Sequence, residues 1–120
     1  PHITDDDCIE VCNMIVEEKK YQCLLKILMD NRMSFSRVEL FKKYAHYMSE
    51  EDQAIYTKHV IDDLRKHLSY AKSKSYGYIV DDIKGMYTCC EVSKKLILDF
   101  VEEVEYNYGN RPALMRLLRN

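Results

Sequence analysis

The chain has 120 residues, of which 47% are hydrophobic and 32% charged, a composition typical of a folded domain and not of a disordered segment. Its formal net charge is −2, so no overall positive field attracts it to nucleic acid or to an anionic membrane. Three glycines and two prolines leave few turn signals for β-hairpins. We therefore expect an all-α fold, a compact bundle of about six or seven amphipathic helices that forms one domain over residues 1–120.

The five cysteines are an odd number and lack the regular spacing of a secreted disulfide scaffold, which favours a reducing compartment. The sequence shows no signal peptide, no lipidation signal and no apolar run of about 18 residues. We expect a soluble intracellular protein, in the cytoplasm and without membrane contact. Because the sequence begins at Pro1 without a methionine, we also expect it to be part of a longer protein.

The first third of the chain predicts helix over Asp5–Asp30. Thr4 is followed by three aspartates, which is the pattern of a helix start. The polar cluster at residues 17–20 is either a solvated turn of one continuing helix or a kink. Apolar residues recur at helical spacing on both sides of it, at Ile9, Cys12, Ile15 and Val16 and then at Cys23, Leu24, Ile27 and Leu28.

A second helix is predicted to begin at Ser36. Ser36 and Glu39 have the spacing of a capping box, and Phe35 and Leu40 occupy the staple positions around it. The next predicted N-cap, Ser49, follows directly after Met48. The helix that begins at Ser36 and the helix after it must therefore turn sharply against each other. The expected buried stripe is Val38, Phe41, Ala45 and Met48.

The longest helical pattern runs from Ser49 to Lys72 and is expected to be the central helix of the bundle. Ser49 is a good N-cap, and the three acidic residues after it suit the positive end of the helix dipole. Asp62 and Lys66 lie four residues apart on the polar face and predict a weak ion pair. The expected buried face is Ala54, Thr57, Val60, Ile61, Leu64, Leu68 and Ala71.

Three further elements are predicted after the central helix. Residues 73–77 are the best loop candidate, and they precede a short helix that Gly85 ends. Thr88 and Glu91 repeat the capping box and start a longer helix, and Pro112 suits the first turn of the last one. The expected buried residues are Ile79, Val80 and Ile83, then Val92, Leu96, Ile97, Phe100, Val101 and Val104, and finally Leu114, Leu117 and Leu118.

The two capping boxes lie 52 residues apart, and other residues match at the same offset. Ile9 matches Ile61, for example, and Ile27 matches Ile79. These matches are either a coincidence or the sign of an internal repeat. In the second case the chain is part of an array of helical units, whose usual role is to present a binding surface.

No arrangement of residues predicts catalysis, so we expect a protein that is not an enzyme, with no catalytic residue, no metal site and no cofactor. Cys8 and Cys12 have a spacing that lets two thiolates bind one metal, but a complete site would need a distant residue such as His59. We expect instead that Cys12 is a core residue and Cys8 a partly buried one. Acidic pairs such as Asp62 and Asp63 are expected to be solvated surface.

One local feature predicts binding, the run of lysines and tyrosines at residues 66–78. Tyrosine is enriched in interface hot spots, so we interpret the run as a patch that binds another protein. The alternative function is a nucleic-acid-binding helical domain, because lysines and aromatic rings together also bind single strands. A purely structural helix end, with cations that suit the dipole, is the third interpretation. The patch residues are Lys66, Tyr70, Lys72, Lys74, Tyr76 and Tyr78, and His67 lies in the same run.

The predicted helices resemble two families of small helical proteins. The long first helix, the short capped helices and the Ser-Tyr-Gly-Tyr-Ile segment at residues 75–79 are similar to a caspase-recruitment domain of the death fold, over residues 5–85 at most. The helix count and the many tyrosines and isoleucines are similar to compact viral proteins of the Bcl-2 type. Both resemblances imply an adaptor or regulator of an intracellular signalling complex, in innate immunity or apoptosis. Its partner would be another protein, with a homo-oligomer as an alternative.

Overall fold

The computed structural model describes residues 4–30 and 37–120, and this part of the chain is all-α, as predicted. Seven α-helices and three short 3₁₀-helices, labelled η1 to η3, follow one another along the described residues, none of which lies in a strand. The α-helices are α1 (Asp5–Glu17), α2 (Leu24–Leu28), α3 (Arg37–Tyr44), α4 (Glu50–Tyr70), α5 (Tyr76–Tyr87), α6 (Glu91–Tyr108) and α7 (Pro112–Arg119). The 3₁₀-helices are η1 (Tyr21–Cys23), η2 (Ala45–Tyr47) and η3 (Ser73–Ser75).

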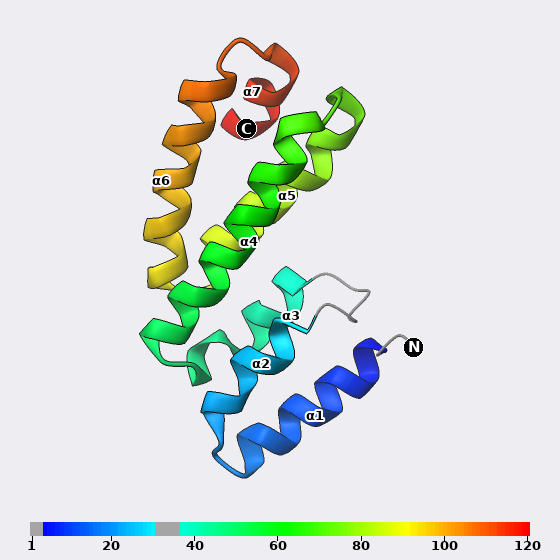
Figure 1. Ribbon diagram of the computed structural model, residues 1–120, viewed down its shortest axis with the longest axis vertical. Helices are drawn as coiled ribbons and strands as arrows, with labels where there is room; N and C mark the ends of the chain where they lie inside the picture. The colour runs from blue at the N-terminus through cyan, green and yellow to red at the C-terminus, as the bar shows by residue number, and fades with distance from the viewer. Residues whose placement is uncertain (1–3, 31–36) are drawn as a thin grey trace.

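Helix α4 is the centre of the bundle and runs diagonally through the middle of the molecule in Figure 1. Helix α6 packs along it, and α5 contacts α4, α6 and α7. Helices α1, α2 and α3, which we call the N-terminal half, gather at one end of the molecule (Figure 1). Helices α4 to α7 form the C-terminal half, with α7 at the opposite end. The molecule measures 49 × 31 × 21 Å, so the two halves lie along its longest axis.

Helix α4 begins where the sequence predicts. The hydroxyl of Ser49 caps it by accepting a hydrogen bond from the backbone N–H of Asp52 at 3.1 Å. The helix ends at Tyr70, slightly before the predicted end at Lys72. The reason is that Ala71 takes an extended conformation, with φ −70° and ψ 143°.

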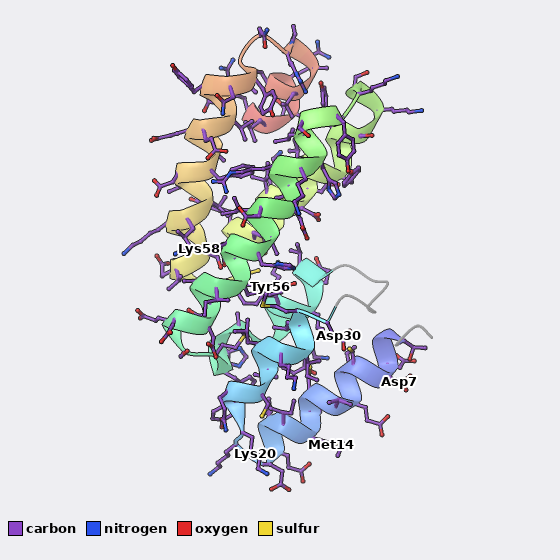
Figure 2. The ribbon with its side chains drawn as sticks, viewed as in Figure 1. Asp7, Met14, Lys20, Asp30, Tyr56 and Lys58 are labelled. Atoms are coloured by element: carbon purple, nitrogen blue, oxygen red, sulfur yellow. The ribbon has the colours of Figure 1, made fainter. Side chains whose placement is uncertain are left out.

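The buried face of α4 is wider than the predicted one. Gln53 and Tyr56 are buried although the apolar spacing did not include them. The side-chain amide of Gln53 donates to the Ala45 carbonyl at 2.7 Å. The ring of Tyr56 packs on Phe41 with centroids 4.6 Å apart, so both residues join α4 to the N-terminal half (Figure 2). Of the predicted face, Thr57, Val60, Ile61, Leu64 and Leu68 are buried, and Ala54 and Ala71 are half-buried.

A chain of hydrogen bonds crosses the contact between α4 and α6. The Thr57 hydroxyl donates to the Gln53 carbonyl at 2.8 Å, which leaves its oxygen to accept from the Ser93 hydroxyl at 2.7 Å. Ser93 lies 3.1 Å from the sulfur of Cys90, whose S–H donates to it. The Thr57 and Ser93 hydroxyls are both fully buried and so lose their hydrogen bonds to water on folding. The hydrogen bond between them replaces part of that loss.

The predicted helix over Asp5–Asp30 is interrupted, and neither alternative is correct, because a turn and η1 separate two helices, α1 and α2, that pack on each other. Helix α1 ends at Glu17, and Lys19 follows with φ 58°, in the left-handed region that often closes a helix. The N–H of Lys20 bonds back to the Ile15 carbonyl at 3.0 Å, which satisfies one of the last carbonyls of α1. The chain then continues as η1 and α2.

Helix α3 begins at Arg37, in agreement with the predicted helix start. The proposed N-cap Ser36 and the staple residue Phe35 lie outside the described residues. The predicted buried stripe is confirmed, although its last two members lie beyond the end of α3, in and after η2. These buried residues are Val38, Phe41, Ala45 and Met48.

The prediction that α5 ends at Gly85 is wrong, because the helix continues to Tyr87. A Cβ atom at Gly85 would lie 2.7 Å from Cγ1 of Val38, so the glycine allows α5 to pack closely on α3. The second predicted capping box does not form, because Thr88 is the C-cap of the longer α5 and so cannot cap the start of α6. The Thr88 hydroxyl donates to the Gly85 carbonyl at 2.8 Å, and α6 begins only at Glu91.

The remaining predictions hold in part. Residues 73–77, predicted as a loop, form η3 and the start of α5. Helix α7 packs through Leu114 and Met115, and Leu118 is half-buried. Leu117 was predicted to be buried but is 36% exposed, because it lies at the edge of this face, about 160° around the helix from Met115. On α6, Ile97, Phe100 and Val104 are buried, and Val92, Leu96 and Val101 are half-buried.

The elements themselves recur at the offset of 52 residues that the sequence suggests. The 3₁₀-helix η1 spans residues 21–23 and η3 spans residues 73–75, and each lies between two α-helices that contact each other. We call residues 15–26 the first corner and residues 67–78 the second corner. Buried pairs at this offset are Cys8 and Val60, Cys12 and Leu64, Leu24 and Tyr76, Leu28 and Val80, Phe41 and Ser93, Ala45 and Ile97, and Met48 and Phe100.

Candidate interaction surface

The structure brings five of the six predicted patch residues together on the outside of the second corner. Lys66 and Tyr70 lie near the end of α4, and Lys72 lies in the two-residue linker between α4 and η3. Lys74 lies in η3, and Tyr78 lies at the start of α5. All five side chains are exposed, that of Tyr70 by 70% and that of Tyr78 by 48%. These two rings therefore place apolar area in water, where a partner can cover it.

Tyr76, the sixth predicted residue, does not lie on this surface. It is a core residue, only 6% exposed, and its hydroxyl accepts a hydrogen bond from Nη1 of Arg111 at 3.4 Å. Arg111 also donates to the Leu68 carbonyl at 3.2 Å and lies 4.4 Å from the centre of the Tyr108 ring. Tyr76 thus holds the second corner against the start of α7 from the inside.

A cleft of about 300 Å³ lies between the exposed side chains of the second corner. Helix α4 contributes a histidine and a tyrosine, the linker and η3 contribute two lysines, and α5 contributes a second tyrosine. Because four consecutive parts of the chain line it, the fold of the corner determines the shape of the cleft. The lining residues are His67, Tyr70, Ala71, Lys72, Lys74, Ser75 and Tyr78.

His67 connects the aromatic residues of the cleft, although the predicted patch did not include it. Its ring centroid lies 6.1 Å from that of Tyr70 and 5.9 Å from that of Tyr78. The interplanar angles are 75° and 71°, so both pairs have the edge-to-face arrangement that aromatic rings prefer. A sequence signal for His67 did exist, because residues three apart on a helix share a face and Tyr70 lies three residues further on.

Two lysines line the cleft, and two aspartates follow on α5 beyond its lining residues. Lys72 and Lys74 line it from the linker and η3. On α5, burial raises the pKa of the Asp82 carboxyl, Asp81 raises it further, and the nearby His67 acts in the opposite direction. Positive charge is therefore concentrated before the start of α5 and negative charge within it.

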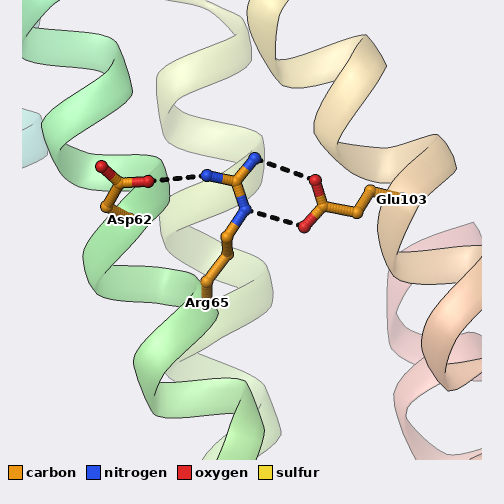
Figure 3. Close-up of polar contacts among 3 residues, drawn as sticks. All are labelled: Asp62, Arg65 and Glu103. Atoms are coloured by element: carbon orange, nitrogen blue, oxygen red, sulfur yellow. Dashed lines mark hydrogen bonds and ion pairs between the residues drawn. The ribbon is translucent and has the colours of Figure 1, made fainter.

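The groove between α4 and α6 is a second charged surface, but ion pairs occupy it. Arg65 donates to both carboxylate oxygens of Glu103, at 2.8 Å each (Figure 3). Its third nitrogen donates to Asp62 at 2.6 Å, so the predicted pair of Asp62 with Lys66 is wrong. The hydrogen bonds from Arg65 lower the pKa of Glu103. Since the guanidinium is fully engaged within the protein, we assign the pair a structural role.

Two of the five cysteines, Cys8 and Cys12, lie in the core. Cys12 is fully buried, as expected, but Cys8 is buried as well and not partly exposed. Burial, with a further contribution from Cys8, raises the pKa of Cys12 to about 11. A thiol that stays protonated is a poor nucleophile and a poor ligand. No group of three or more His, Cys, Asp or Glu side chains in residues 4–30 and 37–120 is placed to hold a metal ion.

No known family model matches this chain, and no curated protein or solved structure is significantly similar to it. The resemblances to caspase-recruitment domains and to viral Bcl-2-like proteins therefore stay predictions. In the part of the chain that the structure describes, no helix combines the length and the apolar character needed to cross a membrane. The second corner itself is the basis for a functional proposal.

Proposed function

We propose that this chain is a non-enzymatic protein-interaction module, adaptor or regulatory in role, that binds another protein through the second corner. The observation that supports it is the grouping of two exposed tyrosines, Tyr70 and Tyr78, with Lys72 and Lys74 around one cleft. Tyrosines are enriched among the residues that dominate interface energetics, because they cover a large area at a small cost in conformational entropy. The small interaction bundles that the sequence resembles would use a surface in the same way.

The first corner indicates that the fold does not need these rings. It has the same order of elements, a helix, a 3₁₀-helix and a second helix. Glu18 occupies the position equivalent to Tyr70, and Lys26 occupies the position equivalent to Tyr78. Both side chains are exposed. A corner of this kind therefore forms with charged residues at these positions, so binding explains the two tyrosines better than folding does.

A nucleic-acid strand is the alternative ligand, and the distribution of charge favours protein. Binding of a strand requires a positive groove that follows the phosphate backbone over several nucleotides. Here Lys72 and Lys74 occupy one side of the cleft, while Asp81 and Asp82 follow on α5. The chain as a whole has a net charge of −2. An extended phosphate backbone that crossed the cleft would meet these carboxylates.

Affinity capture tests the proposal. The wild-type chain and the variant Tyr70→Glu/Tyr78→Lys are immobilised and exposed to cell lysate with and without nuclease. The variant carries the residues of the first corner and has the same net charge as the wild type. We expect quantitative mass spectrometry to find at least one protein that the wild type binds and the variant loses. As a control, Tyr106→Glu removes a tyrosine that is 90% exposed on α6, outside the cleft, and should leave this capture unchanged.

Two results would contradict the proposal. If the variant retains every protein that the wild type captures, the second corner is not the binding surface. If capture disappears on nuclease treatment, the bound species is a nucleic acid, and the alternative function takes the place of the proposed one.

A further inference from the structure

We propose that the cleft of the second corner binds an acidic peptide segment that carries an aromatic side chain. The aromatic ring would sit in the cleft, and the carboxylates would lie beside Lys72 and Lys74. The partner chemistry named here rests on the function proposed above and specifies it. Three properties of the cleft support it, namely its volume, its rings and the positive charge of its lysines.

The volume of the cleft suits a single large side chain. Ligand sites in proteins enclose about 300–1,000 Å³, and this cleft, at about 300 Å³, lies at the lower end of that range. It is too small for most cofactors, whereas one aromatic residue of an extended segment fills it. The remainder of such a segment would lie over the exposed faces of Tyr70 and Tyr78.

The rings of the cleft are arranged so that a further ring can join them. Tyr70 and Tyr78 each stand edge-on to His67, at centroid distances of 6.1 and 5.9 Å. Aromatic rings prefer edge-to-face or offset contacts at about 4.5–7 Å, so a ring that enters the cleft finds edges and faces at suitable distances. Aliphatic side chains would cover the same area without these contacts.

The positive charges of the cleft select the sign of the peptide. Lys72 and Lys74 line the cleft, and Lys66 lies one helical turn before Tyr70. Carboxylates of a peptide are attracted to this side and repelled from Asp81 and Asp82 on α5. The lysines are exposed, so the attraction is screened by salt over a Debye length of about 10 Å at 0.1 M. Binding should therefore weaken as the salt concentration rises.

The first corner provides an internal comparison. Ile15 stands at the position of His67 and Gln22 at the position of Lys74. With Glu18 and Lys26 at the positions of the two tyrosines, this corner has no aromatic ring at any of the three equivalent sites. We expect it not to bind the same peptide, which makes its lysines suitable for control substitutions.

Nuclear magnetic resonance of the ¹⁵N-labelled chain tests this specificity directly. The probe is the blocked peptide acetyl-Glu-Glu-Tyr-Glu-Glu-amide, titrated at low salt. We expect chemical-shift changes concentrated in the second corner and a Kd below about 1 mM. A peptide with alanine in place of the tyrosine, and one with lysines in place of the glutamates, should each bind at least about tenfold more weakly.

Matched charge variants separate the cleft from the rest of the surface. Lys72→Glu/Lys74→Glu should weaken binding of the acidic peptide by about tenfold or more. Lys20→Glu/Lys26→Glu makes the same change of net charge at the first corner, where both lysines are exposed, and should leave the Kd within about twofold of the wild type. The dispersion of the amide spectrum shows whether each variant is folded. The wild-type titration does not depend on any variant.

Three outcomes would overturn this specificity. The first is the absence of shift changes in the second corner, and the second is equal binding of the peptide that lacks tyrosine. The third is tighter binding of an oligo-dT strand to the same residues. The capture experiment is independent of the peptide, because a protein lost with Tyr70→Glu/Tyr78→Lys would show that the second corner binds a partner of another chemistry.

Discussion

The first and second corners share an order of elements and one buried position, Leu24 and Tyr76, but they differ in backbone path and in surface. At the first corner Lys19 has a left-handed backbone just after α1, which ends at Glu17. Its equivalent Ala71 is extended, and α4 ends at Tyr70, one position later than the equivalent of Glu17. The first corner exposes charged side chains where the second exposes tyrosines. The comparison indicates that the same order of elements forms with different exposed side chains, which leaves the exposed positions free to serve binding.

The two halves that contain these corners are joined through α4, which contacts α2 and α3, and through α5, which contacts α3. Tyr56 of α4 packs on Phe41 of α3, and α5 approaches α3 where Gly85 faces Val38. Within the N-terminal half, the Tyr44 hydroxyl lies 2.6 Å from Oδ1 of Asn13 and so connects α3 to α1. Substitutions at the joining contacts should therefore have larger effects than substitutions at the exposed positions of either corner.

The largest effect is expected from Gly85→Ala, which changes the contact between the halves. The added Cβ would lie 2.7 Å from Cγ1 of Val38, so the variant should lose about 2–3 kcal/mol of unfolding free energy through overpacking. Urea unfolding measures this loss. Val38→Ala removes the clashing atoms, so the double variant Val38→Ala/Gly85→Ala should be more stable than the sum of the two single changes predicts. Additive effects would mean that α5 and α3 do not touch here.

An intermediate effect is expected from Thr57→Val, within the C-terminal half. The change leaves the buried Ser93 hydroxyl without its acceptor, which should cost about 1–2 kcal/mol in urea unfolding. The position equivalent to Ser93 in the N-terminal half is Phe41, so the first half packs this site without hydroxyl groups. Thr57→Val/Ser93→Ala removes both hydroxyls and should recover part of the loss. A double variant that is as unstable as the sum of the single changes would contradict the hydrogen bond.

The smallest effect is expected at the ion pair of Arg65 and Glu103. Hydrogen bonds from Arg65 lower the pKa of Glu103 below its ordinary value of 4.5, so the pair stabilises the fold above that pH. This contribution is lost as the pH falls through the lowered pKa. The Glu103 side chain is 36% exposed, so solvent screening keeps the contribution below about 1 kcal/mol. Arg65→Gln should reduce the loss of stability on acidification. Urea unfolding of the wild type and the variant at neutral and acidic pH measures this difference. An unchanged pH dependence in the variant would contradict the ion pair.

Sequence patterns predicted the helices wherever local signals agree with tertiary packing. The cap at Ser49 and the apolar spacing after it placed α4 correctly, because both arise within the helix itself. Thr88 has the spacing of a capping box, but Gly85 does not end α5, and the longer helix takes up Thr88. The glycine instead lies against Val38, which is 47 positions earlier in the sequence, so no local signal reveals this contact.

The candidate site was predictable in composition but not in exposure. Lys72, Lys74 and the two outer tyrosines lie together because they are close in sequence. Tyr76 precedes Ile79 by three residues and Ile83 by seven, which is the spacing of a buried helix face. Placing the helix start at Tyr76 would have identified it as a core residue. The cleft itself depends on how α4, η3 and α5 fold against each other, and sequence spacing does not describe that.

The most direct test of the central claim is the unfolding free energy of Tyr70→Glu/Tyr78→Lys. If the exposed rings of the second corner serve binding and not folding, the variant should unfold within about 0.5 kcal/mol of the wild type, as is usual for surface substitutions. A loss of about 2 kcal/mol or more would show that the two tyrosines are part of the packed structure, and it would contradict their assignment to an interaction surface.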